Sequence, residues 1–175
     1  MNEILGETER IYIRRMTPDD TDLIVDWRNR DAVRNNFFFR ETFTKQMHEN
    51  WIREKIDTGL VEQFIVCLKG NDRPIGSSYL RDIDRQEKSA EYGIFIGEDD
   101  ARGKGLGYEI LCATMEYALN TIGLHKVIAR AISTNIASIS IFEKYGFLHD
   151  RMMKNVPCTD GNVADMVMLS YQKDS

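Results

Sequence analysis

Three glycines at alternate positions stand directly before an apolar helical pattern, in the segment DDARGKGLGYEIL at residues 99–111. Glycine readily adopts backbone conformations that are closed to other residues, and it is unfavourable inside helices. A strand pattern at 90–97 precedes the glycines, and a helix pattern at 104–121 and a strand pattern at 126–132 follow them. A strand, a helix and a strand in this order require a parallel pair of strands with a right-handed crossover.

The rest of the chain shows patterns of antiparallel strands and shorter helices. Helices are predicted from Thr17 to about Asn29, from Thr44 to Gly59 and from Asn135 to Tyr145, and further strands at 9–15, 62–69, 75–83 and on either side of a turn at 158–162. The sequence therefore predicts a single α/β domain over residues 1–175, with its core at about 9–171. The expected sheet is mixed and mostly antiparallel, with six to seven strands and helices on both faces.

Composition narrows the class of protein. The chain has 175 residues, of which 42% are apolar and 29% charged, and its formal net charge is −5. This balance is typical of one globular domain, and the negative charge argues against nucleic acid as a partner. No apolar run is long enough to cross a membrane and the start, MNEILGETER, is too polar for a signal peptide, so a cytoplasmic location is expected. The three histidines and three cysteines lack the spacing of metal ligands, so no metal is expected.

A glycine-rich turn between a strand and a helix is suited to binding an anion. The first N–H groups of a helix have no partner within it, and a missing Cβ lets a phosphate approach them. Arg102 and Lys104 add positive charge there. Two common phosphate motifs do not fit, because Tyr108 stands where G-x-G-x-x-G needs glycine and no Lys-Ser/Thr pair follows. The alternative is a structural loop whose glycines allow close packing of the helix on the sheet.

The segment Arg102-Gly103-Lys104-Gly105-Leu106-Gly107 resembles the R/Q-x-x-G-x-G/A signature of the Gcn5-related N-acetyltransferases (GNAT). Downstream, residues 135–138 (NIAS) and 142–147 (FEKYGF) are similar to the N-x-x-S/A and (Y/F)-E-K-x-G-F elements of that family. The resemblance covers nearly the whole chain and extends to the enzymes that acetylate ribosomal proteins or nucleotide-linked amino sugars. It implies acetyl-coenzyme A (acetyl-CoA) as the acetyl donor.

The resemblance also implies where acetyl-CoA binds. The glycine loop would hold the pyrophosphate, the strand before it would splay from its neighbour and pair with pantetheine, and the helix at 135–145 would pack beside the cofactor. The implied cofactor-binding residues are Ile94, Phe95, Ile96, Arg102, Gly103, Lys104, Gly105, Leu106, Gly107, Asn135, Ser138, Phe142 and Lys144.

Glu91, on the strand before the glycine loop, is the best-placed carboxylate for a general base that deprotonates the incoming ammonium. The alternative is a solvated strand glutamate, because Glu91 alternates with the apolar positions that follow it. The family often uses a tyrosine on the later helix as the acid for the departing thiolate, and Phe142 stands at the matching position. We therefore expect catalysis without a dedicated acid, or with Tyr145 as a weak substitute.

Four arginines and one aspartate lie between residues 28 and 40 of a chain that is acidic overall. The resemblance implies that this region lines the acceptor cleft. The residues expected to bind the acceptor are Arg28, Arg30, Arg34, Phe38, His48 and Trp51. Guanidinium groups pair with phosphates and aromatic rings stack on bases or sugars, so the first prediction is an amino sugar on a nucleotide carrier. The alternative is that the arginines pair with acidic residues elsewhere in the chain.

Three functions remain open at this point. The first is acetyl transfer to a small-molecule amine, and the second is acetylation of a protein N-terminus, as in the ribosomal-protein enzymes. The third is a non-catalytic acetyl-CoA sensor, which Phe142 suggests. Polyamine acceptors fit less well because they call for an acidic cleft. The expected assembly is a monomer or homodimer, with neither nucleic acid nor a membrane as partner.

Overall fold

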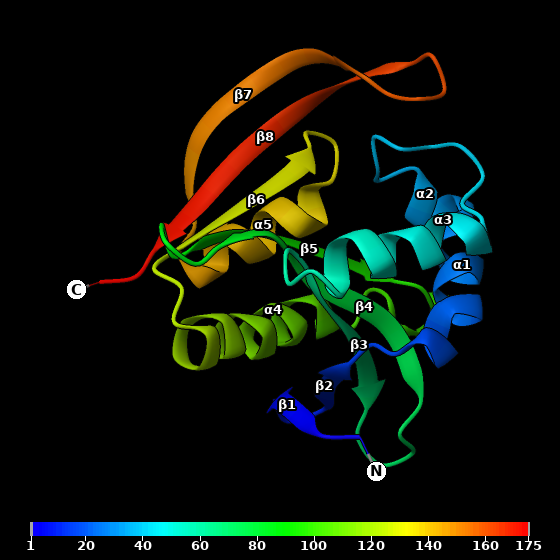
Figure 1. Ribbon diagram of the computed structural model, residues 1–175. Coiled ribbons are helices and arrows are strands. Elements are labelled where there is room, and N and C mark those ends of the chain that lie inside the picture. Colours follow the sequence, from blue (N-terminus) through cyan, green and yellow to red (C-terminus); the bar gives the residue numbers. More distant parts are fainter. Residues whose placement is uncertain (1, 175) are drawn as a thin grey trace.

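An eight-stranded sheet forms the centre of the molecule, in the order β1-β2-β3-β4-β5-β6-β8-β7 (Figure 1). The computed structural model describes residues 2–174. The strands are β1 (Ile4–Glu7), β2 (Ile11–Arg15), β3 (Glu62–Leu68), β4 (Pro74–Asp84), β5 (Ser89–Ile96), β6 (Lys126–Ile132), β7 (Leu148–Pro157) and β8 (Val163–Gln172). Among these strands only β5 and β6 pair in parallel. The predicted mixed sheet is confirmed, but it has eight strands, one more than the upper end of the predicted range.

Except for the short α2, which was not predicted, the helices begin and end close to the predicted residues. They are α1 (Thr21–Asn29), α2 (Asp31–Arg34), α3 (Lys45–Trp51), α4 (Leu106–Glu116) and α5 (Ile136–Tyr145). A 3₁₀ turn at Pro18–Asp20 precedes α1, and π-helical turns extend α3 over Ile52–Ile56 and α4 over Tyr117–Ile122. Thr44 caps α3, since its hydroxyl accepts a hydrogen bond from the Met47 N–H at 3.2 Å.

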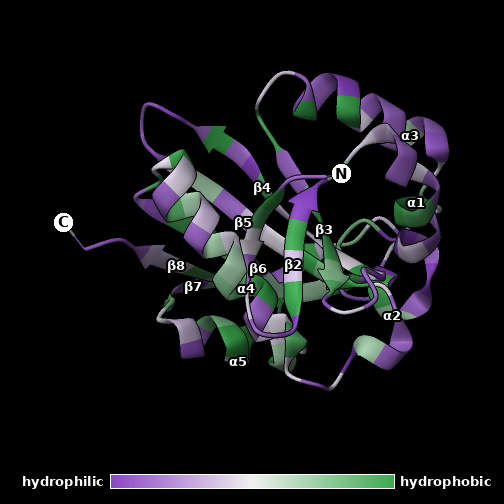
Figure 2. Ribbon diagram, turned by 90° about the horizontal axis from the view of Figure 1, so that it is seen from below, coloured by the Kyte–Doolittle hydropathy of each residue, from purple (hydrophilic) through white to green (hydrophobic). Residues whose placement is uncertain are grey.

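Each face of the sheet has its own apolar cluster. The larger cluster joins α4 and α5 to the sheet and includes Ile13, Ile110 and Leu111. The smaller one joins α1 to the sheet through Trp27 and α2 through Val33. Along these helices hydrophobic and hydrophilic residues alternate, as one-sided burial requires (Figure 2). Over residues 2–174, no helix combines the length and the apolar character that a membrane span needs.

The strand that the sequence did not reveal is β1, at the edge of the sheet. It has four residues, of which Ile4 and Glu7 are exposed, so it lacks the alternation that marks a half-buried strand. Gly6 is required there because a Cβ at this position would lie 2.8 Å from the carbonyl oxygen of Ala113 on α4. A glycine inside a short pattern weakens the strand signal, although here it permits close packing on the helix.

Candidate active site

The parallel pair of strands opens partway along its length. β5 pairs with β6 only from Ser89 to Tyr92, the latter opposite Ala129. Beyond this point β5 stays paired with β4 as far as Ile96, and β6 stays paired with β8 as far as Ile132. The two strands therefore diverge after Tyr92, as the resemblance implies, and their facing edges border a gap.

The glycine loop lies at the carboxyl end of β5 and leads into α4. Gly103 and Gly105 have φ angles of +73° and +78°, in the left-handed region that favours glycine, and Gly105 is the N-cap of α4. The acidic residue in the first turn, Glu109, accepts hydrogen bonds from Thr8 and Arg10, which offset its charge. The free N–H groups of this helix start suit an anion, so the loop fits a coenzyme A pyrophosphate.

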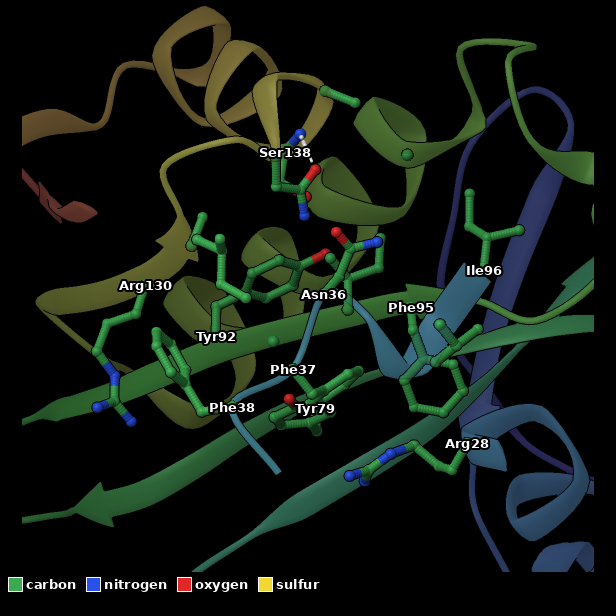
Figure 3. Close-up of a pocket in the computed structure, with 18 of the residues that line it drawn as sticks. Arg28, Asn36, Phe37, Phe38, Tyr79, Tyr92, Phe95, Ile96, Arg130 and Ser138 are labelled. Carbon is green, nitrogen blue, oxygen red and sulfur yellow. Dashed lines mark hydrogen bonds between the residues drawn. The ribbon is translucent and has the colours of Figure 1, made fainter. Parts of the chain in front are cut away.

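A cavity of about 1210 Å³ connects the strand gap, the glycine loop and the region of α1–α3 (Figure 3). Part of its wall comes from the loop after α2, which is held to the turn between β7 and β8. The Thr159 N–H donates to the Phe38 carbonyl at 3.0 Å, and the Arg40 N–H donates to the Thr159 hydroxyl at 2.7 Å. The cofactor loop and the acceptor region thus open into one continuous space.

Most of the predicted cofactor residues border this cavity. The lining includes Ile94, Phe95, Ile96, Arg102, Gly103, Gly105, Leu106, Gly107, Asn135, Ser138 and Phe142. Asn135 caps α5, where its side-chain oxygen accepts from the Ser138 N–H at 3.3 Å. Arg102 donates to the Ile96 carbonyl and pairs with Asp99, so its guanidinium is held at the edge of the loop.

Two of the predicted cofactor residues do not line the cavity. Lys104 borders a small separate pocket with Arg10 and Arg73. Lys144 lies over the ring of Tyr108, with its ammonium 4.0 Å from the ring centroid. Neither lysine side chain forms part of the cavity wall. Tyr108, which the sequence analysis named only as a mismatch to a motif, does line it.

Glu91 lines the cavity, but two arginines hold its carboxylate. It accepts a hydrogen bond from Arg81 Nε at 2.8 Å, one from an Arg130 terminal nitrogen at 3.0 Å and another from Arg130 Nε. Burial raises the pKa of Glu91, and the Arg81 guanidinium lowers it in part. The side chain is 13% exposed, so the solvated strand glutamate considered from the sequence is not what the structure shows.

Tyr145 is placed away from the cavity, so the expectation that it substitutes for the missing acid is corrected. Its ring packs against Phe147 and Tyr171, with centroids 6.0 and 5.2 Å away. Burial raises the pKa of Tyr145 to about 12. The side chain belongs to the apolar packing beneath α5, and of these two residues only Phe142 lines the cavity.

Arg28 is the one arginine of the acceptor segment that faces the cavity (Figure 3). Its guanidinium lies 4.2 Å from the Phe37 ring centroid and 4.6 Å from that of Phe43. Burial lowers the pKa of Arg28, although an arginine remains charged in proteins. In the part of the chain that the structure describes, no carboxylate forms an ion pair with it.

Arg30 and Arg34 do not line the cavity, and their expected role in binding the acceptor is corrected. Arg30 donates to the Gly97 carbonyl at 2.8 Å and pairs with Asp26, four residues earlier. Arg34 pairs with Asp31, three residues earlier. The alternative drawn from the sequence, that the arginines pair with acidic residues, therefore holds for these two.

The other acceptor residues, Phe38, His48 and Trp51, line the cavity. His48 is 1% exposed, and its Nδ1 lies 3.0 Å from the Thr21 hydroxyl. No hydrogen-bond partner for His48 Nε2 is found within residues 2–174. Burial lowers the pKa of His48, which favours the neutral ring.

Sequence reasoning missed most of the positive charge in the cavity. Within the described residues the charged lining consists of one carboxylate, Glu91, and five arginines: Arg28, Arg81, Arg102, Arg130 and Arg151. Arg81 stands directly opposite Glu91 in the β4–β5 pairing, so the register of that hairpin is the signal that would have found it. Arg130 and Arg151 lie on strands far from β5 in the sequence, and no local pattern marks them.

Comparisons with known proteins agree with this architecture. A relative from Methanocaldococcus jannaschii, an uncharacterized protein, is 30% identical over 82% of the chain, and the chain spans 29% of that protein's length. The fold matches spermidine N-acetyltransferase from Vibrio cholerae, solved with CoA and spermine, at a TM-score of 0.85, 19% identity and coverage of 93% and 95% of the two chains. It also matches RimL, a ribosomal L7/L12 alpha-N-protein acetyltransferase solved with coenzyme A, at a TM-score of 0.84, 15% identity and coverage of 98% and 99%.

At these identities the two solved structures establish the fold, and they do not select the ribosomal-protein or amino-sugar branch that the sequence suggested. The family model described as "Acetyltransferase (GNAT) domain" matches residues 10–148, which include the splayed strands and the glycine loop. The chain therefore belongs to the GNAT acetyltransferase family, as an N-acetyltransferase domain that takes acetyl-CoA as its acetyl donor.

Proposed function

We propose that this protein transfers the acetyl group of acetyl-CoA to a primary amine on a small acceptor that also carries a negative charge. One observation carries the proposal: five arginines and a single carboxylate line the cavity of an otherwise acidic chain. A cleft of one sign concentrates ligands of the opposite sign. A polycation would meet repulsion there, which separates this cavity from one suited to spermidine.

Arg28 is the proposed anchor for the acceptor's anionic group. The guanidinium lies against the Phe37 and Phe43 rings and forms no ion pair within the described residues, so its N–H groups are available for a carboxylate or phosphate. Arg81 and Arg130 already share Glu91, so they offer less unpaired charge. An amino sugar on a nucleotide carrier fits these requirements, with Arg28 as the one of the three predicted acceptor arginines that lines the cavity.

The glycine loop, the edge of β5 and Glu91 have different proposed roles in the reaction. The glycine loop and the start of α4 would hold the pyrophosphate of acetyl-CoA, which supplies the activated acetyl group as a thioester. The edge of β5 from Ile94 to Ile96 offers backbone groups to pantetheine and an N–H to polarise the carbonyl. We propose that Glu91 accepts a proton from the acceptor ammonium, directly or through water, while Arg81 and Arg130 keep its carboxylate in place.

Acceptor kinetics test this assignment. The test uses a panel of acceptors that differ mainly in charge. It contains glucosamine 1-phosphate, the same amino sugar without its phosphate, and spermidine. Arg28→Ala should raise the KM of the phosphorylated acceptor about tenfold or more, because a lost charge-assisted hydrogen bond is worth about 1.5–3 kcal/mol. The KM of acetyl-CoA should not change, and Arg34→Ala is the matched control because Arg34 pairs with Asp31 outside the cavity.

Other outcomes select the two alternatives. Preference for spermidine, or an unchanged KM in Arg28→Ala, would contradict an anionic acceptor. Efficient acetylation of a peptide N-terminus with no gain from a phosphate or carboxylate would favour the protein acetyltransferase. Tight binding of acetyl-CoA with no turnover on any amine would favour the sensor that Phe142 suggested.

A further inference from the structure

Tyr92, a residue of the cavity wall, carries a buried hydroxyl group without a partner. The residue is 2% exposed, and within residues 2–174 nothing accepts or donates a hydrogen bond to its oxygen. The side chain nevertheless lines the cavity, and Figure 3 shows its ring reaching from β5 into that space. A buried polar group that lacks a partner costs stability, so a phenylalanine would serve the packing better if packing were its only role.

The position of Tyr92 connects this hydroxyl with the acetyl donor. Tyr92 is the last residue of the parallel pairing, opposite Ala129, so it stands where β5 and β6 begin to diverge. Its ring meets that of Phe142 edge to face, with centroids 5.9 Å apart and an interplanar angle of 89°. Phe142 occupies the place at which the family resemblance implies a tyrosine. The hydroxyl that is absent from α5 is thus present on the neighbouring ring.

We infer that the Tyr92 hydroxyl donates a hydrogen bond to the sulfur of the acetyl donor as the carbon–sulfur bond breaks. The inference rests on the acetyl transfer of the proposed function, whatever the acceptor. The acceptor nitrogen forms a bond to the carbonyl carbon, and the carbon–sulfur bond breaks with its electron pair going to sulfur. Of the two protons that the ammonium loses, one ends on the sulfur and the other is released to water. Tyr92 gives up no proton, so it acts as a fixed donor to the developing negative charge.

The surroundings of Tyr92 suit a donor that does not titrate. Burial raises its pKa well above the ordinary value for tyrosine, and Tyr79 from β4 and Cys112 from α4 raise it further. The side chain facing it from α5 is the uncharged Phe142. The hydroxyl therefore stays protonated across the neutral range. The negatively charged thiolate accepts its hydrogen bond more strongly than the neutral thiol does.

The first experiment needs no acceptor and no turnover. The thiol pKa of CoA bound to the wild-type protein is measured by the ultraviolet absorbance of the thiolate. The complex with desulfo-CoA is the blank that subtracts the absorbance of the protein's own three cysteines. Tyr92→Phe keeps the ring against Phe142 and removes only the hydroxyl. We expect the pKa of the bound thiol to rise by about one unit in this variant, corresponding to a tenfold loss of thiolate stabilisation. Affinity for desulfo-CoA should be equal in both proteins.

Turnover supplies the second readout. Tyr92→Phe should lower kcat by about tenfold or more while the KM of acetyl-CoA changes little, as expected for a contact that strengthens when charge develops on sulfur. Tyr145→Phe is the control, because its ring lies outside the cavity, and it should leave both readouts unchanged. An unaltered thiol pKa in Tyr92→Phe would overturn the inference even if kcat fell. If no anionic acceptor were acetylated, the proposed function would be contradicted. The pKa of the bound thiol would still test the role of Tyr92 independently.

Discussion

The two ends of the cavity are built from different kinds of contact. At the cofactor end, the glycine loop, the start of α4 and the Asn135 cap of α5 present backbone groups, and their conformations follow from nearby residues. At the acceptor end, side chains from α1, β4, β5 and β6 meet, and Glu91 binds one arginine 10 residues away and another 39 residues away. A local backbone site can be recognised in a sequence, whereas a site made of distant side chains depends on pairing register and ion-pair partners.

This difference predicts that single substitutions have opposite signatures at the two ends. A change in the glycine loop should affect acetyl-CoA and leave the choice of acceptor intact. A change among the arginines should alter the acceptor and leave acetyl-CoA binding intact.

The largest effect is expected for Gly105→Val. At a φ of +78° a β-branched residue is strained, and relaxing that strain turns the N–H groups of the first turn of α4 away from the pyrophosphate. Loss of several charge-assisted hydrogen bonds should weaken CoA binding about a hundredfold or more, as measured by calorimetry. Gly59→Val is a matched control, because Gly59 has the same φ of +78° at the end of the α3 segment. It should lower stability and spare CoA affinity. Unchanged CoA affinity in Gly105→Val would make the loop purely structural.

A smaller but still large effect is expected for Glu91→Gln. If Glu91 is the base, kcat/KM falls as the pH drops through its pKa, because only the carboxylate accepts a proton. Burial raises that pKa, so the acidic limb should lie above the ordinary range of glutamate. The variant should lose this limb and turn over about a hundredfold more slowly at neutral pH.

Glu62→Gln provides the control for the loss of a carboxylate between arginines. Glu62 lies near Arg15 and Arg85 and is 15% exposed, close to the 13% of Glu91, but it lies outside the cavity. A near-normal rate in Glu91→Gln with the acidic limb intact would leave deprotonation to solvent. An equal loss in Glu62→Gln would show that both carboxylates are structural.

The smallest effect is expected for Arg30→Ala. This residue belongs to the acceptor segment, but its substitution should affect the cofactor end of the cavity. Arg30 lies in the acceptor segment, yet it holds the Gly97 carbonyl and pairs with Glu98, directly before the glycine loop. An exposed ion pair is worth about 1 kcal/mol or less, so CoA affinity should fall only a few-fold, with the acceptor KM unchanged. A higher acceptor KM with normal CoA affinity would restore the role that the sequence suggested for this arginine.

The features that could be predicted from the sequence are those that depend on residues close together in the chain. Caps such as Thr44 and Asn135, the glycines at positive φ and the strand-to-helix alternation all act over a few residues, so the fold and the cofactor end were accessible. The errors at Arg30 and Arg34 were avoidable in part. Each has an aspartate four or three residues before it, a spacing that brings the two side chains together on a helix.

The remaining features depend on tertiary structure. The pairing of Arg81 with Glu91 needs the β4–β5 register, and Arg130 joins them only because β6 lies beside β5. Tyr145 and Phe142 share α5 and differ by three residues, yet only Phe142 faces the cavity. Which face a helix turns to its neighbours is set by packing across the whole sheet, and the motif on α5 does not reveal it.

The divergence of β5 and β6 after Tyr92 gives this sheet an edge in its interior. From Gly93 to Ile96 and from Arg130 to Ile132, each strand is paired on its outer side only, so the amide groups between them are satisfied by whatever enters the gap. A pantetheine chain in that position would supply the hydrogen bonds that the two strands do not make with each other. It would thereby join the β1–β5 half of the sheet to the β6–β8 half. Ligand binding and folding are then linked: saturation at about a hundred times Kd adds about 2.7 kcal/mol of stability. Slower hydrogen exchange at those amides would show where the two halves are joined.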